Sequence, residues 1–229
     1  MFPFPIFITI YAGFAHAFET DHLLAVSNIV SQRNNTFKSL KDGIFWGLGH
    51  TSTILLIGVL MLLLKVHIAE NYFHYLEAGV GMMLIILGVI RLYKLKRYRG
   101  EEENIPHTHP HVHATIATAA IPNITNTGIK KLHLVSYGVG MVHGLAGSGE
   151  LVLLVMLQMA SPQIGIMYLL IFGIGSIFGM LVAAGLFSIP FSKRILQAKA
   201  LQIGLIVLSS LLCIGFGISI VYKNLMVHQ

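Results

Sequence analysis

Four ionisable side chains lie within one apolar stretch near the amino terminus, which reads Gly13-Phe-Ala-His16-Ala-Phe-Glu19-Thr-Asp21-His22. A charged carboxylate at the centre of a membrane helix costs about 2.5–3.5 kcal/mol on insertion scales, so two of them need a cation, a water-filled cavity or polar partners. Imidazole with carboxylate suits nickel, cobalt, zinc or iron, whereas calcium and magnesium prefer all-oxygen ligands. The stretch predicts a transition-metal site, with a structural polar network between helices as the alternative.

A single straight helix cannot direct all four side chains at one ion. At about 100° per residue, His16, Glu19 and His22 share an arc of about 120°, while Asp21 points about 100° away from His22. Either the helix unwinds near Thr20, as transporter helices do around their sites, or Asp21 orients a ligating imidazole by hydrogen bonding to it.

Two later apolar stretches add candidate ligands. Gly47-Leu-Gly49-His50-Thr51-Ser52-Thr53 places a histidine beside three hydroxyl groups. His143-Gly144-Leu-Ala-Gly147-Ser148-Gly149-Glu150 contains three glycines, which predict a broken helix whose exposed backbone groups line a cavity. His50 and His143 are predicted ligands, although intramembrane histidines can also simply bridge two helices. Glu150 is a further candidate for the ion pathway, and Glu77 is expected toward its outer entrance.

A histidine tract lies outside these stretches, in a long polar segment. His107, His109, His111 and His113 alternate with other residues, so an extended chain places four imidazoles on one side. Such a tract predicts secondary metal contact, by which a loop buffers, hands over or senses the ion. The alternative is a solvated linker whose histidines have no role.

The elements that must position these groups are membrane helices. Hydrophobic residues make up 55% of the 229 residues and charged residues only 10%, with a mean hydropathy of +0.77. An ordinary soluble domain carries about 25% charged residues. The expected fold class is therefore an all-α integral membrane protein with six transmembrane helices, at residues 5–30, 43–64, 72–92, 133–159, 163–189 and 200–222.

The basic residues predict the topology and argue against a nucleic-acid partner. Of the fifteen lysines and arginines, thirteen flank the connections after the first, third and fifth spans. The positive-inside rule then places these connections in the cytoplasm and both termini outside, in a multi-pass protein of the cell membrane. The amino terminus lacks a basic region before its apolar run, so the first span is expected to be mature protein and not a cleaved signal peptide.

Two ordered blocks of sequence recur at nearly one offset. Gly13-Phe-Ala-His16 matches Gly140-Met-Val-His143, and Trp46-Gly-Leu-Gly-His50 aligns with Phe172-Gly-Ile-Gly-Ser176. Three spans per half make the second copy inverted, the plan of secondary transporters whose sites lie near the midplane. We expect a first repeat at 1–97, a cytoplasmic histidine-rich loop at 98–131 and a second repeat at 132–229. The glycines can also serve as close helix contacts.

Other functions remain as alternatives at this point. Histidines on different helices could bind a b-type haem, and the histidine loop could belong to a metal sensor or a membrane scaffold. Cys213 is the only cysteine, so paired-thiol chemistry within the chain is excluded. An enzyme is not expected, because there is no H-E-x-x-H motif and no serine or cysteine nucleophile with a paired base.

The H-x4-D-H pattern of His16 to His22 resembles the first-helix signature of the nickel/cobalt transporter family, and Leu48-Gly-His50-Thr-Ser-Thr53 resembles its second-helix motif. The chain is most similar to the short branch of six-helix, urease-accessory nickel permeases. The resemblance implies Ni²⁺ or Co²⁺ as substrate, without a prosthetic group. It also implies that His16, Asp21, His22 and His50 contact the ion, and that partners include a cytoplasmic metallochaperone or urease maturation proteins.

The sequence departs from that family in two ways. Glu19 stands inside the x4 segment, and the histidine tract is typical of the efflux branch, which leaves the direction of transport open. The short branch also resembles the membrane part of thiol-disulfide electron carriers of the cytochrome-biogenesis type. Those carriers need a cysteine in each of two repeat-related helices, where this chain has His16 and His143.

Overall fold

The computed structural model describes residues 6–33, 35–64, 70–103, 133–146, 161–191 and 199–227. This part of the chain contains helices and no strands, which confirms the predicted all-α class. The long elements are α1 (Ile6–His16), α2 (Thr20–Val30), α3 (Thr36–Leu64), α4 (Glu70–Glu103), a helix over residues 133–146, α6 (Pro162–Ser188) and α7 (Lys199–Tyr222). Two short elements, η1 (Ile189–Phe191) and η2 (Lys223–Val227), follow α6 and α7.

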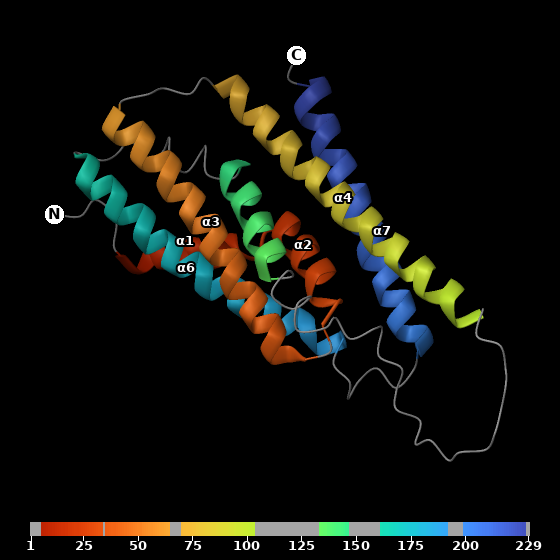
Figure 1. Cartoon of the computed structure of the whole chain (residues 1–229). Helices are drawn as coiled ribbons and strands as arrows, with labels where there is room; N and C mark the ends of the chain where they lie inside the picture. Colours follow the sequence, from red (N-terminus) through yellow and green to blue (C-terminus); the bar gives the residue numbers. More distant parts are fainter. Residues whose placement is uncertain are drawn as a thin grey trace.

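The helices form two packed groups (Figure 1). In the first group α6 packs against α1 and α3, and in the second α4 lies alongside α7. The short helix α2 contacts members of both groups, namely α3 and α6 on one side and α4 and α7 on the other. The helix over residues 133–146 lies beside α3. These short elements thus occupy the middle of the molecule.

Four of the described helices are long and apolar enough to cross a bilayer. They cover Thr36–Leu63, Tyr72–Arg97, Pro162–Phe191 and Ala200–Met226. Each exceeds the roughly 20 residues that a hydrocarbon layer of about 30 Å requires. The chain is therefore a multi-pass membrane protein. Of the predicted span at 133–159 the structure describes only residues 133–146, so the prediction of six spans stays a prediction.

The predicted first span, at 5–30, contains two short helices and not one continuous helix. α1 ends at His16 and α2 begins at Thr20, with extended backbone at Glu19 (φ −64°, ψ 152°). Short turns connect the two helices at the break. In them the backbone N–H groups of Phe18 and Glu19 donate hydrogen bonds to the carbonyl oxygens of Ala15 and His16. Both arrangements that the sequence allowed for the four polar side chains are observed: the chain unwinds before Thr20, and Asp21 accepts a hydrogen bond from the His22 ring.

The helix α4 extends beyond its apolar segment. The span that could cross a bilayer ends at Arg97, where the first repeat was predicted to end, and the helix continues to Glu103 into the predicted loop. Lysine, arginine and glutamate are good helix formers, so a helix that leaves an apolar environment can continue through a charged stretch. The histidine tract at 107–113 lies outside the described residues.

Paired glycine contacts hold the first group of helices together. A Cβ atom on Gly13 of α1 would lie 2.1 Å from the carbonyl oxygen of Phe172 in α6, and one on Gly175 of α6 would lie 2.2 Å from that of Ile10. Both helices approach too closely for a side chain at either position. Glycine is required there because backbone packs directly on backbone.

The same contact recurs between α3 and the helix over residues 133–146. A Cβ atom on Gly140 would lie 2.1 Å from the carbonyl oxygen of Trp46, and one on Gly49 would lie 2.1 Å from that of Tyr137. These positions are the sequence counterparts of the α1/α6 contact at the offsets found for the two halves of the chain. Equivalent glycines thus make equivalent contacts in both places.

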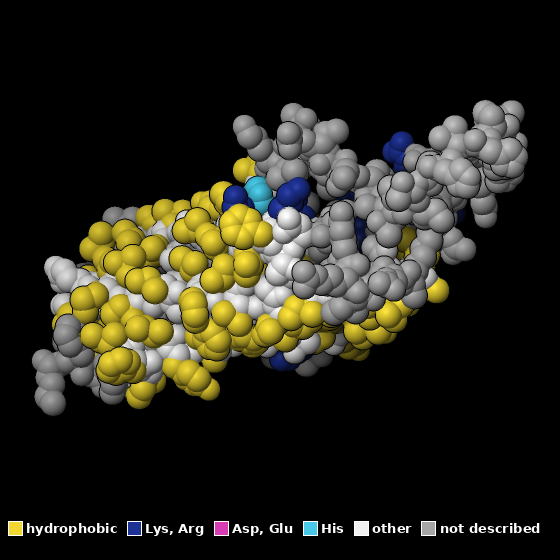
Figure 2. All heavy atoms as spheres, turned by 90° about the horizontal axis from the view of Figure 1, so that it is seen from below, with side chains coloured by type: hydrophobic (Ala, Val, Ile, Leu, Met, Phe, Trp, Pro, Cys, Tyr) yellow, Lys and Arg dark blue, Asp and Glu magenta, His cyan; other side chains and the backbone are white. Residues whose placement is uncertain are grey.

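The outer surface of the described part is strongly apolar. On the face drawn in Figure 2, most of the described side chains are hydrophobic, and the described lysine and arginine side chains appear in only a few places. Large exposed residues include Phe7, Leu134 and Tyr93, which are 83%, 71% and 68% exposed. Such a surface matches lipid as its surroundings, because apolar patches of this extent are rare on soluble monomers.

Candidate metal centre

Four histidines from four helices meet in the interior. His16 ends α1, His22 lies in the first turn of α2, and His50 lies in the middle of α3. His143 comes from the helix over residues 133–146. The last three are at most 2% exposed. The α1–α2 break brings His16 and His22 together, since their ring centroids are 4.7 Å apart.

The four rings are in mutual contact around His22. Its ring centroid lies 4.5 Å from that of His143 and 5.4 Å from that of His50, and His16 lies 5.1 Å from His50. Two sets of three residues have ligand atoms that all lie within 4.8 Å of one another: His16, His22 and His50, and Asp21, His22 and His143. His22 belongs to both sets, so it is the geometric centre of the cluster.

A hydrogen bond fixes the tautomer of three of the imidazoles. The Nδ1–H of His16 donates to Glu19 Oε1 at 2.8 Å, and that of His22 to Asp21 Oδ1 at 3.1 Å. His143 Nδ1–H donates to the carbonyl oxygen of Val139 at 3.2 Å. With the proton on Nδ1, each Nε2 keeps its lone pair. Metal-ligating histidines usually show this arrangement of a supported ring with a free second nitrogen.

The remaining ring nitrogens make no hydrogen bond within the part of the chain that the structure describes. The Nε2 atoms of His16, His22 and His143 and both nitrogens of His50 are buried without a hydrogen bond in the described part of the chain. Buried side-chain nitrogens without a partner are uncommon, because leaving one unsatisfied costs about 1–3 kcal/mol. Their convergence fits a cation or ordered water between the rings and does not fit a closed network of helix-bridging hydrogen bonds.

The two carboxylates near the cluster have different positions. The Asp21 side chain is 24% exposed, and its Oδ2 lies 3.7 Å from His143 Nε2, so it can bind an ion and also orient His22. The Glu19 side chain is 56% exposed and contacts His16 only through Nδ1. The structure therefore places Glu19 at the rim, where it supports the His16 ring.

Three hydroxyl groups that the sequence placed beside His50 are used elsewhere. Thr51 Oγ1 donates to the carbonyl oxygen of Gly173, Ser52 Oγ to that of Leu48 and Thr53 Oγ1 to that of Gly49. Each hydroxyl thus satisfies backbone between or within helices. Glu77 is half-buried on α4 and belongs to neither set of candidate ligands, while Glu150 and the four loop histidines lie outside the described residues.

The sequence assigned Trp46 to a repeated block but did not predict that it lies at the centre. The indole of Trp46 stacks on the His22 ring at 5.8 Å with an interplanar angle of 11° and contacts His143 at 5.4 Å. It is 1% exposed. Its position one helical turn before His50 is the signal that could have identified it, because residues four apart share a helix face.

Comparison with known proteins places these observations in a family. Residues 12–221 match the family described as the cytochrome C biogenesis protein transmembrane region. The urease accessory protein UreH of Bacillus sp. (strain TB-90) is 36% identical over 214 residues, which cover 92% of this chain and 87% of that protein.

Two plant proteins are more distant relatives. The chloroplast proteins FOR GROWTH AND FERTILITY 1 and 2 of Arabidopsis thaliana are each 28% identical over more than nine-tenths of this chain, which spans 56% and 55% of their length. No solved structure matches the chain. The chain therefore belongs to the family of the cytochrome c biogenesis protein transmembrane region and to that of the urease accessory protein UreH.

Proposed function

We propose that this protein carries a divalent transition-metal ion, nickel first and cobalt second, across the membrane through the histidine cluster. The observation that carries the proposal is the convergence of unpartnered imidazole nitrogens on His22, which belongs to both sets of candidate ligands. Imidazole with one carboxylate suits a borderline divalent ion. The ion is the substrate of this site and not a resident cofactor.

Nickel is favoured over the other borderline ions by the relatives. The H-x4-D-H pattern resembles that of nickel/cobalt transporters, and the protein at 36% identity is named as a urease accessory protein. His16, His22, His50 and His143 are proposed as nitrogen ligands, with Asp21 as the oxygen ligand. Transient partners on the cytoplasmic side would be a metallochaperone or urease maturation proteins.

The proposed mechanism uses two inverted halves. The equivalent glycine contacts of α1 with α6 and of α3 with the helix over residues 133–146 support this symmetry. In such transporters the halves rock around a site near the midplane and open it to one side at a time. A hydrated ion would exchange waters for imidazoles at the cluster and leave after the halves move. The basic connections would face the cytoplasm.

Two other functions fit the geometry less well. A b-type haem needs a slot between its two axial histidines, but these rings contact one another at centroid distances of 4.5–5.4 Å. Thiol-disulfide exchange would need a second thiol, and Cys213 lies buried on α7, with Sγ hydrogen bonded to the carbonyl oxygen of Leu84. Neither chemistry uses Asp21.

The test is the metal content of cells with and without the protein. Expression should change cellular nickel, measured by mass spectrometry beside cobalt, zinc and manganese, and the sign of the change gives the direction. His22→Ala should abolish the change at equal protein level. Deleting residues 105–114 should leave most of the flux, whereas a metal sensor would lose its response. An unchanged nickel content in all cases would refute the proposal.

A further inference from the structure

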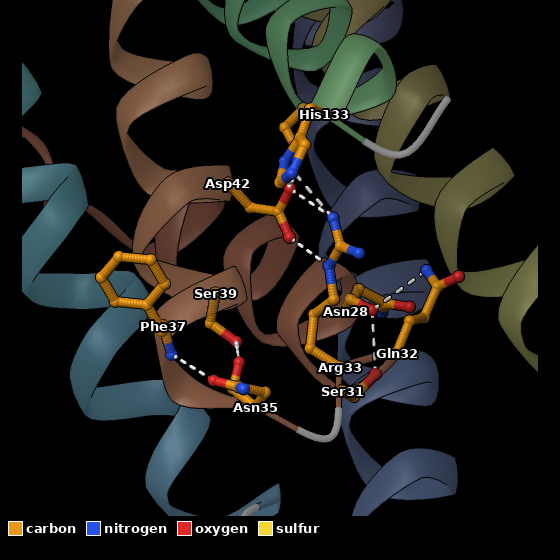
Figure 3. Close-up of polar contacts among 10 residues, drawn as sticks. Asn28, Ser31, Gln32, Arg33, Asn35, Phe37, Ser39, Asp42 and His133 are labelled. Carbon is orange, nitrogen blue, oxygen red and sulfur yellow. Dashed lines mark hydrogen bonds and ion pairs between the residues drawn. The ribbon is translucent and has the colours of Figure 1, made fainter. Parts of the chain in front are cut away.

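A second polar cluster lies at one end of the helices that supply the histidines. Arg33 follows α2, Asp42 lies early in α3, and His133 begins the helix over residues 133–146. Figure 3 shows Arg33 and His133 both directed at the Asp42 carboxylate. The three residues, with Ser136, are called the Asp42 cluster below.

The Asp42 carboxylate is fully engaged. Arg33 donates from Nε to Oδ2 at 2.5 Å and from Nη2 to Oδ1 at 2.8 Å, a bidentate pair. His133 Nδ1 lies 2.6 Å from Oδ1, and Ser136 Oγ donates to the same oxygen at 3.2 Å. The Arg33 and Asp42 side chains are 3% and 1% exposed. Charge-assisted and bidentate hydrogen bonds of this kind are stronger than hydrogen bonds between neutral groups.

This cluster lies on the same helix faces as the metal centre. Asp42, Trp46 and His50 are spaced by four residues on α3, so they form one stripe. His133, Ser136 and His143 form a matching stripe on the neighbouring helix. Asp42 is eight residues before His50 in α3, which at about 1.5 Å per residue is roughly 12 Å. In each helix the cluster lies toward the end that carries the basic connections.

Trp46 lies between the two clusters on α3. Its indole covers His22 and His143, and a Cβ atom on Gly140 would lie 2.6 Å from its Cδ1, so the wall behind the histidines is tight. Further polar contacts hold the same end of the molecule. Arg91 donates from Nη2 to the carbonyl oxygen of Ser31 at 2.7 Å, which ties α4 to this corner.

We propose that Arg33, Asp42 and His133 close the ion pathway on the cytoplasmic side, with the Arg33 guanidinium occupying the carboxylate that a departing or arriving divalent ion uses. Arg33 is a tethered cation on the oxygens of Asp42. A carboxylate with an adjacent imidazole is the same donor chemistry as the inner site, so the ion replaces the guanidinium when the helices separate. The proposal rests on the proposed function for the identity of the ion.

The closure can be measured without transport, by thiol labelling. Val139 is 6% exposed and lies between the Asp42 cluster and His143, so Val139→Cys in a Cys213→Ala background reports on this space. A membrane-impermeant maleimide is applied to inverted membrane vesicles, which present the cytoplasmic face, and to right-side-out vesicles. The protein that carries only Val139→Cys and Cys213→Ala is the parent, and its labelling should be slow. Arg33→Gln should speed it from the cytoplasmic face by roughly 10- to 100-fold, the loss expected for charge-assisted hydrogen bonds.

Controls separate closure from misfolding and from metal binding. Lys41→Gln removes the same charge from an exposed position beside Asp42 and should leave labelling slow. Folding is judged by a single symmetric elution peak in detergent. Should Arg33→Gln fail that check, His133→Ala takes its place, because His133 is partly exposed (16%) and its loss removes the contact that joins the helix over residues 133–146 to Asp42.

The outcomes are distinct. Fast cytoplasmic labelling in folded Arg33→Gln or His133→Ala supports the closure. Labelling as slow as in the parent, or faster only from the outer face, overturns it. Equilibrium binding of radioactive nickel to the same purified proteins is measured separately. A parent that binds no nickel refutes the proposed function, while the labelling result still decides whether the cluster closes this end.

Discussion

At the scale of single residues, the environment of each imidazole determines what it can do. His16, His22 and His143 each use Nδ1 to contact an acceptor and leave Nε2 free. His133 also contacts a carboxylate through Nδ1, but there the carboxylate is paired with an arginine. The same side chain is therefore a candidate ligand in one cluster and part of a closed ion pair in the other.

The central position of His22 leads to a prediction about metal binding. His22→Ala should weaken equilibrium nickel binding to the purified protein by roughly 100-fold or more, because losing an outer-shell partner alone typically costs 10- to 100-fold. His74→Ala makes the same substitution on α4, where His74 contacts Asn224 away from the cluster, and should leave binding unchanged. Equal affinities for the two variants would rule out His22 as a ligand.

The stacked indole gives a second prediction at this scale. Trp46→Ala removes the wall behind His22 and His143, so nickel affinity should fall by about 10-fold as the rings lose their orientation. Trp46→Phe keeps a stacked ring and should recover most of that affinity. The measurement is the same binding isotherm, and a phenylalanine variant as weak as the alanine variant would show that stacking does not position the rings.

At the scale of helices, the break between α1 and α2 builds the centre. In a continuous helix the Asp21 side chain would point away from the histidines. With the turn at Ala17 to Glu19, the polar residues of α1 and of α2 both lie toward α3. Backbone contacts at glycine hold α1 and α3 close to their partners. One added methyl group at such a glycine would therefore force the two helices apart.

This sensitivity can be tested with alanine substitutions. Gly13→Ala should destabilise the protein by about 1–3 kcal/mol, the range for overpacking, because the new methyl group meets the carbonyl oxygen of Phe172. Gly79→Ala is the matched control, since nothing lies within 4 Å of a Cβ atom there. Thermal unfolding in detergent compares the two. A Gly13→Ala variant as stable as Gly79→Ala would contradict the close helix contact.

At the scale of the whole molecule, two helix groups share one central set of short helices. The α4/α7 pair is less enclosed by protein than α6. In the most apolar part of each helix, 33% of the residues of α4 and 22% of those of α7 are buried, against 50% for α6. Lipid is expected to cover the remainder. Charged side chains are buried together at one end of the described helices, where Arg33, Asp42 and Arg91 are at most 6% exposed.

The orientation of the molecule is open to a direct test. Alkaline phosphatase fused after Gln229 should be active in intact bacterial cells, because the distribution of basic residues predicts that this terminus lies outside. The same reporter fused after Glu103, at the end of α4, should be inactive, since that end is expected in the cytoplasm. The opposite pattern would reverse the topology, and with it the side that the Asp42 cluster closes.

The sequence by itself determined the membrane class, the approximate places of the long helices and the ionisable residues that lie within the apolar segments. Those features depend on composition and on local spacing, which are independent of how the helices pack. His16, Asp21, His22, His50 and His143 were all identifiable because ionisable groups are rare and costly in apolar segments.

Only the tertiary structure decided which of these groups share a space and which neighbours support them. The break at residues 17–19 brought His16 and His22 together, and the packing of α3 brought Trp46 against His22. The Asp42 cluster joins residues up to 100 positions apart, namely Arg33 and His133, so no local sequence pattern predicts it. Side chains from distant segments meet only once helix packing is set, and packing depends on all the contacts together.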